Sequence, residues 1–209
     1  MRRSELVRLL QRVPGFSSPR ADLEQLATPA EAAATLLATA ERLDGLRGRS
    51  VVDLGCGTGR LALGAAALGA SPVVGVDLDA GAVAAARAAA ESAGLTVRFE
   101  VGPVGSVVAP AEVVVMNPPF GAQRRHADRP FWDAAFRLAQ RSVYAFSLAA
   151  SRTFIARRAV GRRARVLELV PVPWVLGATL PHHRRHGVSV EVDLWAIRTE
   201  GSEDGPGAA

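Results

Sequence analysis

The stretch VVDLGCGTGR at residues 51–60 decides the fold. Its first four residues, 51–54, have the composition of a short buried strand. A loop follows with glycine at every second position, and residues 58–68 are rich in alanine and leucine, which predicts a helix. Glycines at such a junction let the backbone turn sharply and approach a ligand closely. We therefore expect a strand–loop–helix unit that binds a small molecule at its loop.

The rest of the chain continues this alternation. Further strands are predicted at 72–76, 96–101, 112–116, 142–146, 164–172 and 188–197, and further helices at 79–93, 130–141 and 151–161. Such alternation predicts an α/β, Rossmann-like fold with a seven-stranded, mostly parallel sheet covered on both faces. No helix separates the last two strands, so we expect the last strand to be antiparallel.

Residues before the glycine loop are predicted to form helices that pack on this core. A short helix is expected at 4–13 and a turn-rich segment at 14–28. Thr28 is expected to cap a second helix, with Pro29 at its first position and its end near Gly45. The predicted organisation is N-terminal helices at 1–48, a catalytic domain at 49–198 and a disordered tail at 199–209.

Composition excludes several classes of protein. The 209 residues are 49% hydrophobic and 22% charged, which is an ordinary globular balance. No apolar run suits a membrane span or a signal peptide, so we expect a soluble, cytoplasmic protein without membrane contact. The net charge is +5, and all 25 basic residues are arginine, which modestly favours an acidic partner such as nucleic acid.

Carboxylates beside the glycine loop indicate the charge of its ligand. Arg60 stands where a dinucleotide fingerprint has its third glycine, and Asp53 would repel a phosphate. A cationic ligand such as S-adenosylmethionine fits better, because it carries a sulfonium and an ammonium but no phosphate. Asp77, at the end of the second strand, is expected to accept both ribose hydroxyls of its adenosyl group. Asp79 is expected to cap the following helix.

A second motif, Asn117-Pro118-Pro119-Phe120, follows the fourth strand and so faces the same crevice. The amide oxygen of Asn117 and the carbonyl of Pro118 can accept both hydrogens of one planar amine, which frees the nitrogen lone pair for in-line attack on a methyl group. Two prolines stiffen the turn, and Phe120 offers a face for a flipped-out base. We expect Asn117 to contact only this amine.

These motifs resemble the class I amino-methyltransferases, and most of all the methyltransferase-like protein 5 type, which methylates adenine N6 in small-subunit ribosomal RNA. The resemblance also covers Leu23-Glu24-Gln25 with Thr28-Pro29, the stretch 116–121 and the final strand at 190–194. Leu26 replaces the family's tyrosine, and Pro103 its aspartate near the cofactor adenine. The resemblance implies that Gln25 and Thr28 cover the cofactor and that the backbone of Val104 contacts adenine. The full expected cofactor set is Gln25, Thr28, Asp53, Gly55, Gly57, Thr58, Gly59, Arg60, Asp77 and Val104.

Two basic clusters are expected to grip RNA phosphates. One follows the catalytic turn with Arg124, Arg125 and His126, and the other includes His183, Arg184 and Arg185 before the final strand. No metal site is expected at the second cluster's histidines, because cysteine and acidic partners are absent nearby.

The resemblance also implies a protein partner, a small zinc-containing activator subunit. The third strand is expected at the sheet edge, with Val97, Phe99 and Val101 alternating with Arg98 and Glu100, and an apolar edge invites strand addition.

Two rival interpretations remain. One is methylation of another nitrogen, in a DNA adenine, cytosine N4 or a protein glutamine, and the other is a non-catalytic RNA-binding module.

Overall fold

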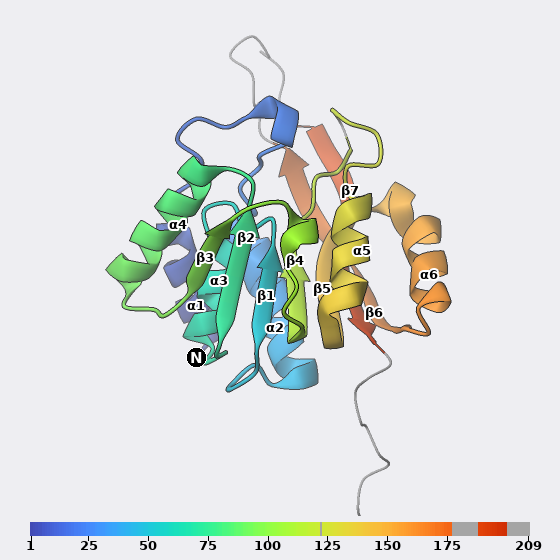
Figure 1. Ribbon diagram of the computed structural model, residues 1–209, viewed down its shortest axis with the longest axis horizontal. Coiled ribbons are helices and arrows are strands. Elements are labelled where there is room, and N and C mark those ends of the chain that lie inside the picture. Colours follow the sequence, from blue (N-terminus) through green and yellow to red (C-terminus); the bar gives the residue numbers. More distant parts are fainter. Residues whose placement is uncertain (122, 177–187, 200–209) are drawn as a thin grey trace, which may run out of the picture.

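The computed structural model of the protein describes residues 1–121, 123–176 and 188–199. Seven strands form one sheet in the order β3-β2-β1-β4-β5-β7-β6 (Figure 1). All neighbours are parallel except β7, which is antiparallel to both β5 and β6. This confirms the predicted α/β fold and its antiparallel last strand. The strands are β1 (Val51–Leu54), β2 (Val73–Asp77), β3 (Arg98–Val101), β4 (Ala111–Met116), β5 (Ala139–Leu148), β6 (Arg165–Leu176) and β7 (Val188–Arg198).

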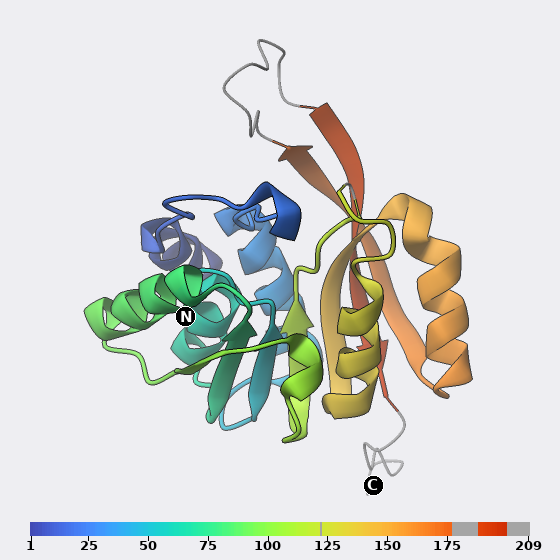
Figure 2. The same cartoon turned by 45° about the horizontal axis from the view of Figure 1, so that its top comes forward.

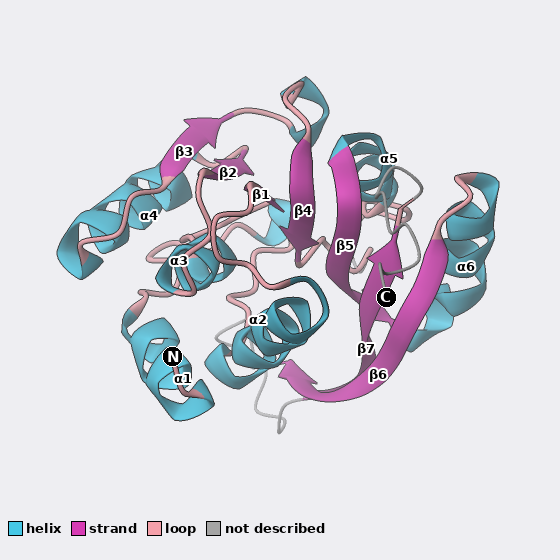
Figure 3. Cartoon of the chain, turned by 90° about the horizontal axis from the view of Figure 1, so that it is seen from below, coloured by secondary structure: helices cyan, strands magenta, loops and turns pink. Residues whose placement is uncertain are grey.

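Helices cover both faces of the sheet, so the protein has two apolar layers (Figure 3). One face carries α1 (Arg3–Arg12), α2 (Ala30–Asp44), α3 (Arg60–Ala67) and α4 (Ala80–Ala93), and the other carries α5 (Arg129–Leu138) and α6 (Arg152–Gly161). Leu10, Leu36 and Leu37 are fully buried, so α1 and α2 belong to the same hydrophobic core as the strands. None of the helices within the described ranges is long and apolar enough to cross a bilayer.

Some boundaries differ from the sequence prediction. The predicted helix 130–141 ends at Leu138, and β5 begins at Ala139 rather than at residue 142. Residues at the start of β5 pair on both sides, with Ala111 opposite Ala139 and Thr199 donating to the carbonyl of Arg141 at 2.9 Å. Tertiary pairing therefore outweighs local helical pattern at this point. Short 3₁₀ turns lie at Ala21–Leu23, Val104–Ser106 and Ala149–Ser151.

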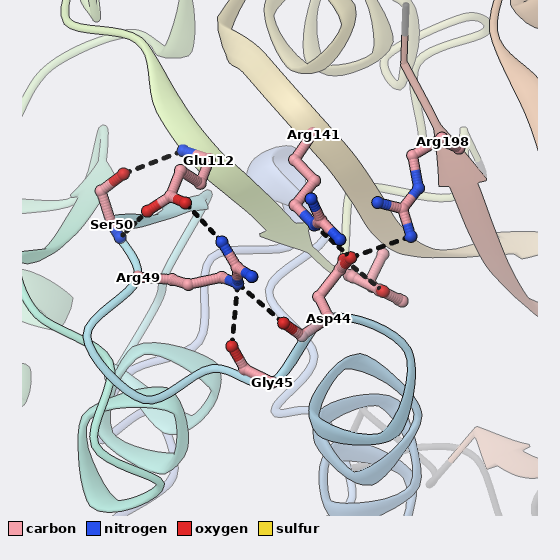
Figure 4. A network of polar contacts seen from close by, with 8 residues as sticks. Asp44, Gly45, Arg49, Ser50, Glu112, Arg141 and Arg198 are labelled. Carbon is pink, nitrogen blue, oxygen red and sulfur yellow. Dashed lines mark hydrogen bonds and ion pairs between the residues drawn. The ribbon is translucent and has the colours of Figure 1, made fainter. Parts of the chain in front are cut away.

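A buried ionic network fastens α2 to the sheet at the end away from the glycine loop (Figure 4). Both carboxylate oxygens of Asp44 accept hydrogen bonds, from Arg141 at 2.7 Å and from the Tyr144 hydroxyl at 2.6 Å, and Arg198 lies 3.0 Å away. Burial alone would raise the pKa of Asp44, but the hydrogen bonds from Tyr144 and its neighbours hold it below its usual value. The network fixes α2, and with it the segment that precedes α2, relative to β5 and β7.

The segment 14–29, here called the strap, joins α1 to α2. In Figures 1 and 2 it passes, in blue, above the carboxyl ends of the central strands. The helix it leads into starts at Ala30 with Pro29 as the N-cap residue, and no side chain caps it. Thr28 is therefore not a helix cap as predicted, because its hydroxyl is engaged elsewhere.

Candidate functional site

The glycine loop joins β1 to α3 in a conformation that only glycine adopts readily. Gly55 and Gly57 have φ values of 70° and 52°. Aromatic rings lie directly against both residues. A Cβ at Gly55 would lie 2.7 Å from the ring of Phe131, and one at Gly57 would lie 2.8 Å from the ring of Phe16. Glycine is needed here both for the turn and for the close approach of a planar group.

The strap is bound to this loop by several side chains. The hydroxyl of Thr58 donates to the carbonyl of Pro14 at 2.6 Å. The guanidinium of Arg60 donates to the carbonyls of Val13, at 2.7 Å, and of Thr28. Thr58 and Arg60, both predicted to line the cofactor, thus also hold the strap over the loop.

Gln25 and Asp79 connect the strap to the start of α4. The amide nitrogen of Gln25 donates to Asp79 at 2.6 Å, while its oxygen accepts from the backbone of Arg20 at 2.8 Å. Asp79 also accepts from the backbone nitrogens of Gly81 and Ala82, which confirms its predicted role as the helix cap.

Two buried carboxylates lie beside the glycine loop at the ends of β1 and β2. Asp53 is fully buried, and one of its oxygens accepts from the backbone of Ala62 at 2.9 Å. Its other oxygen has no hydrogen-bond partner among the residues that the structure describes. Burial, reinforced by the negative charge of Asp77, raises the pKa of Asp53 to about 7. A buried carboxylate with a free oxygen, and with no ion pair to any described residue, is suited to a cationic ligand.

Asp77 is the last residue of β2 and lies against the glycine loop. Its carboxylate accepts from the backbone nitrogens of Gly57, at 2.8 Å, and Asp79, at 2.9 Å. Burial raises its pKa. The two hydrogen bonds fix the carboxylate against the loop, in the position from which the sequence predicted ribose binding.

Asn117 directly follows β4, beside the strap. Its amide nitrogen donates to the hydroxyl of Thr28 at 3.0 Å. Its amide oxygen is buried and has no hydrogen-bond partner in the described part of the chain. The expectation that Asn117 contacts only an acceptor amine is therefore wrong for its nitrogen, which donates to Thr28. A buried acceptor without a donor is costly, which favours a ligand N–H at this position.

Phe120 packs against aromatic neighbours on β5 and β6, on the same face of the sheet. Its ring meets that of Trp174 edge to face, with centroids 5.8 Å apart, and Trp174 meets Phe146 in the same way at 5.1 Å. Trp174 is buried and Phe120 is half-buried, so Phe120 has a supported edge and a partly open ring. The rigid prolines before it, 118 and 119, lie between this ring and Asn117.

A small cavity of about 30 Å³ lies where these elements meet. Its walls come from the glycine loop, the strap and the catalytic motif. They comprise Phe16, Leu26, Ala27, Thr28, Asp53, Gly55, Cys56, Gly57, Thr58, Arg60, Leu61 and Asn117. Seven of the predicted site residues thus surround one space, and its only basic side chain, Arg60, is committed to backbone carbonyls. Phe16 and the strap residues 26–28 form the wall of this space opposite the loop.

Other predicted residues lie around this centre or outside the described ranges. Gly59 completes the loop at the start of α3, and Val104 is buried in the 3₁₀ turn after β3. Arg124, Arg125 and His126 are exposed and follow the catalytic motif directly. The cluster His183, Arg184 and Arg185 and most of the predicted tail, from residue 200, lie outside the described residues.

Sequence reasoning missed four residues that shape the site. Phe16 and Phe131 pack against the glycine loop, and Trp174 packs against Phe120. The fourth is Glu24. The carboxylate of Glu24 accepts from the backbone nitrogens of Gly121, Gln123 and Arg124 at 2.8, 2.8 and 3.3 Å. The stretch Leu23-Glu24-Gln25 stood out in the sequence, but contacts across about 100 positions leave no local signal.

The sheet order, the glycine loop after β1 and the amide-bearing turn after β4 define a Rossmann-like methyltransferase. Residues 29–143 match the methyltransferase small domain family. The zebrafish (Danio rerio) rRNA N6-adenosine-methyltransferase METTL5 is 32% identical over 93% of this chain and 97% of its own. The corresponding Drosophila melanogaster enzyme is also 32% identical, over 91% and 93%. The chain belongs to the methyltransferase small domain family and is an S-adenosylmethionine-dependent methyltransferase.

The fold is shared with solved structures as well. A Pyrococcus horikoshii protein described as a candidate RNA methyltransferase superposes with a TM-score of 0.88 and is 34% identical, covering 95% of this chain and 98% of its own. A Thermoplasma acidophilum protein superposes with a TM-score of 0.76 at 28% identity, covering 96% and 98%.

Proposed function

We propose that this enzyme methylates the N6 amine of an adenine in RNA, in the small-subunit ribosomal RNA. The observation that carries this proposal is the buried amide oxygen of Asn117, which has no partner in the described residues and lies beside the cofactor loop. The zebrafish and fly relatives, named as rRNA N6-adenosine-methyltransferases, support the choice of acceptor. With ribosomal RNA as substrate, the cytoplasm is the proposed compartment.

The acceptor turn, residues 117–120, promotes methyl transfer by positioning the acceptor amine. The oxygen of Asn117 and the carbonyl of Pro118 accept the two N6 hydrogens, which draws the lone pair out of conjugation with the ring. The N6 lone pair would then point in line at the methyl group that S-adenosylmethionine would supply. The adenine stacks on Phe120, whose orientation Trp174 supports. The methylated nitrogen is acidic and loses its extra proton to water, so no strong base is needed.

Residues around the glycine loop would hold the cofactor. Asp77 would accept from the ribose hydroxyls, and the free oxygen of Asp53 would face the cationic methionine part. When bound, S-adenosylmethionine supplies an electrophilic methyl group. The ring of Phe16, which lies against Gly57 in this pocket, would neighbour the bound cofactor.

The test is methylation of purified small-subunit ribosomal RNA with labelled S-adenosylmethionine, followed by mapping of the modified base. Label in an adenine as N6-methyladenosine supports the proposal. Label in DNA, in cytosine or in a protein glutamine under the same conditions would show that adenine N6 in RNA is not the acceptor. Binding of RNA without any transfer, while the cofactor is bound, would favour the non-catalytic alternative.

We also propose a small zinc-containing activator subunit as partner at the edge of β3. Two observations support it: β3 ends the sheet, and Val101 on it is 52% exposed. The expected apolar face is smaller than the sequence indicated, because Phe99 is buried against Gly59 and Gly75 and belongs to the core. Arg87 also donates to the carbonyl of Phe99 at 2.5 Å, so a partner strand would have to displace it.

Co-expression with the candidate subunit and size-exclusion chromatography test this partner. Val101→Arg should abolish a complex at this edge. Val108→Arg, a control at an 82% exposed position beyond β3, should leave it intact. A fully active enzyme that ignores the subunit would end the idea. Phe99→Glu is unsuitable, because it would disrupt the core.

A further inference from the structure

Glu24 lies on the strap in a backbone conformation that glutamate seldom adopts. It follows the 3₁₀ turn Ala21–Leu23 with φ 51° and ψ 39°, in the left-handed region. Such a conformation persists only where surrounding contacts stabilise it, and it is most often found at functional sites. Here it turns the side chain of Glu24 from the strap toward the loop that follows the catalytic motif.

The carboxylate of Glu24 binds three backbone N–H groups of that loop. One oxygen accepts from Gly121 at 2.8 Å, and the other from Gln123 at 2.8 Å and Arg124 at 3.3 Å. Gly121 has φ 81°, which turns the chain so that these N–H groups converge on one anion. Hydrogen bonds to an ionised acceptor are the stronger kind, so a single side chain fixes this loop.

The position of the loop explains why this matters for the reaction. At its amino end, the catalytic motif continues directly from β4, whose last residue Met116 is fully buried. At its carboxyl end it leads into Gly121, where Glu24 binds. The same strap also holds Asn117 through Thr28. The acceptor turn is therefore held from both ends by one segment, and that segment also lies on the cofactor loop.

We propose that Glu24 is a positioning residue for methyl transfer. It fixes the carboxyl end of the catalytic motif so that the acceptor amine is presented in line with the methyl group, and it couples the acceptor turn to the cofactor-covering strap. This inference rests on the proposed function for its kinetic consequence. The hydrogen bonds from the loop amides to Glu24, here called the clamp, can be measured without any substrate.

Hydrogen exchange of the free enzyme tests the clamp directly. In Glu24→Ala the amides of Gly121 and Gln123 should exchange at least about tenfold faster, because they lose their acceptor. Asp22→Ala is the matched control: Asp22 is an exposed acid on the same strap that pairs only with Arg20 among the described residues. Its loss should leave the amides of the loop unchanged. Unchanged exchange in Glu24→Ala would overturn the inference.

Kinetics test the consequence. With cofactor and RNA saturating, Glu24→Ala should lower kcat by about 10²-fold, the effect of a misplaced reacting group, while the cofactor Kd changes less than about threefold. Glu24→Gln keeps one oxygen acceptor and should recover part of the rate, which a merely structural loss would not show. If Glu24→Ala fails to fold, the loop exchange and kcat of Glu24→Gln against Asp22→Ala decide the matter.

The outcomes separate this inference from the proposed function. Faster exchange with an unchanged kcat would show a clamp without a positioning role and overturn the proposal. A wild-type enzyme that methylates no RNA would defeat the proposed acceptor, while the exchange experiment would still report on the clamp. The proposal stands when exchange and kcat change together in Glu24→Ala and neither changes in Asp22→Ala.

Discussion

The amide nitrogen of Asn117 donates a 3.0 Å hydrogen bond to the hydroxyl of Thr28, 89 positions earlier in the chain. This bond stabilises an orientation of the amide in which its oxygen is buried and has no partner among the described residues. A rotation of the amide by 180° would present N–H groups to the acceptor amine instead, and two donors would then face each other. Because the Thr28 hydroxyl can also donate to a rotated amide, the N–H groups of the acceptor amine are what select the observed orientation.

Asn117→Ala should lower methyl transfer by orders of magnitude and leave cofactor binding nearly unchanged. The lost oxygen would serve the acceptor amine in the transition state, whereas no cofactor contact is expected from it. Single-turnover rates and calorimetric titration with S-adenosylmethionine measure the two effects. A variant that keeps more than about a tenth of the wild-type rate would contradict the assigned mechanism.

Thr28→Val should lower kcat by about tenfold, since the amide nitrogen of Asn117 loses its acceptor and the side chain can rotate. Thr28→Ser keeps the hydroxyl and is the matched control, with a rate close to wild type. The comparison of kcat at saturating RNA isolates the effect on the bound complex. Equal rates in the two variants would show that the bond from Asn117 to Thr28 has no part in catalysis.

Local patterns predicted most of the framework correctly. The strand 51–54 and the helix ending at Gly94 were readable because apolar runs and glycines mark them in short windows. Thr28 shows the limit of such reading. Threonine before proline and an acidic first turn is typical of a helix start, yet the same hydroxyl is taken by Asn117, and the helix begins without it.

Residues that depend on long-range packing were not predictable in the same way. Alternation in the third strand predicts an exposed Phe99, but α4 and the glycine loop cover that face and bury the ring. Glu24 and Phe16 lie in a turn-rich segment whose composition indicates only a loop. Their roles arise where the strap crosses the catalytic end of the sheet, which is a property of the folded chain.

Asp77→Ala should weaken S-adenosylmethionine binding by roughly 1.5–3 kcal/mol, because two hydrogen bonds to a carboxylate disappear. The upper part of this range is expected, since Asp77 also orders the backbone of Gly57. Calorimetric titration gives the dissociation constant. Glu91→Ala, on the exposed side of α4, controls for the loss of one negative charge. An unchanged dissociation constant in Asp77→Ala would move the ribose site elsewhere.

Arg124→Ala combined with Arg125→Ala should weaken RNA binding and flatten its salt dependence, by a slope of roughly 0.7–0.9 per lost phosphate contact. The clamp on the loop survives this change, because Glu24 binds the backbone of Arg124 and not its side chain. Arg8→Ala with Arg12→Ala removes the same charge from α1 and should leave the slope unchanged. Parallel lines for the Arg124 and Arg125 variant and the wild type, in titrations at several salt concentrations, would show that these side chains touch no phosphate.

Asp53 predicts a pH dependence of cofactor binding. Its ordinary pKa is 3.8, and burial raises the pKa to about 7 in the folded protein. The stability that its bound proton contributes is fully present below about 3.8 and is lost as the pH rises through about 7. A cationic ligand favours the ionised form, so cofactor binding should release this proton.

The affinity for S-adenosylmethionine should therefore rise with pH, by up to about tenfold between pH 6 and 8, and level off above about pH 8. Calorimetric titrations across this range, compared with Asp53→Asn, isolate the contribution of Asp53 from that of other groups, including the cofactor's own amine. Asp53→Asn carries no titrating proton, and its profile should lack this rise. Burial also raises the pKa of Asp77, which remains in both proteins, so the comparison reports the part of the profile that depends on the Asp53 carboxylate. Parallel pH profiles for wild type and Asp53→Asn would show that the free oxygen of Asp53 does not face the cofactor's positive charge.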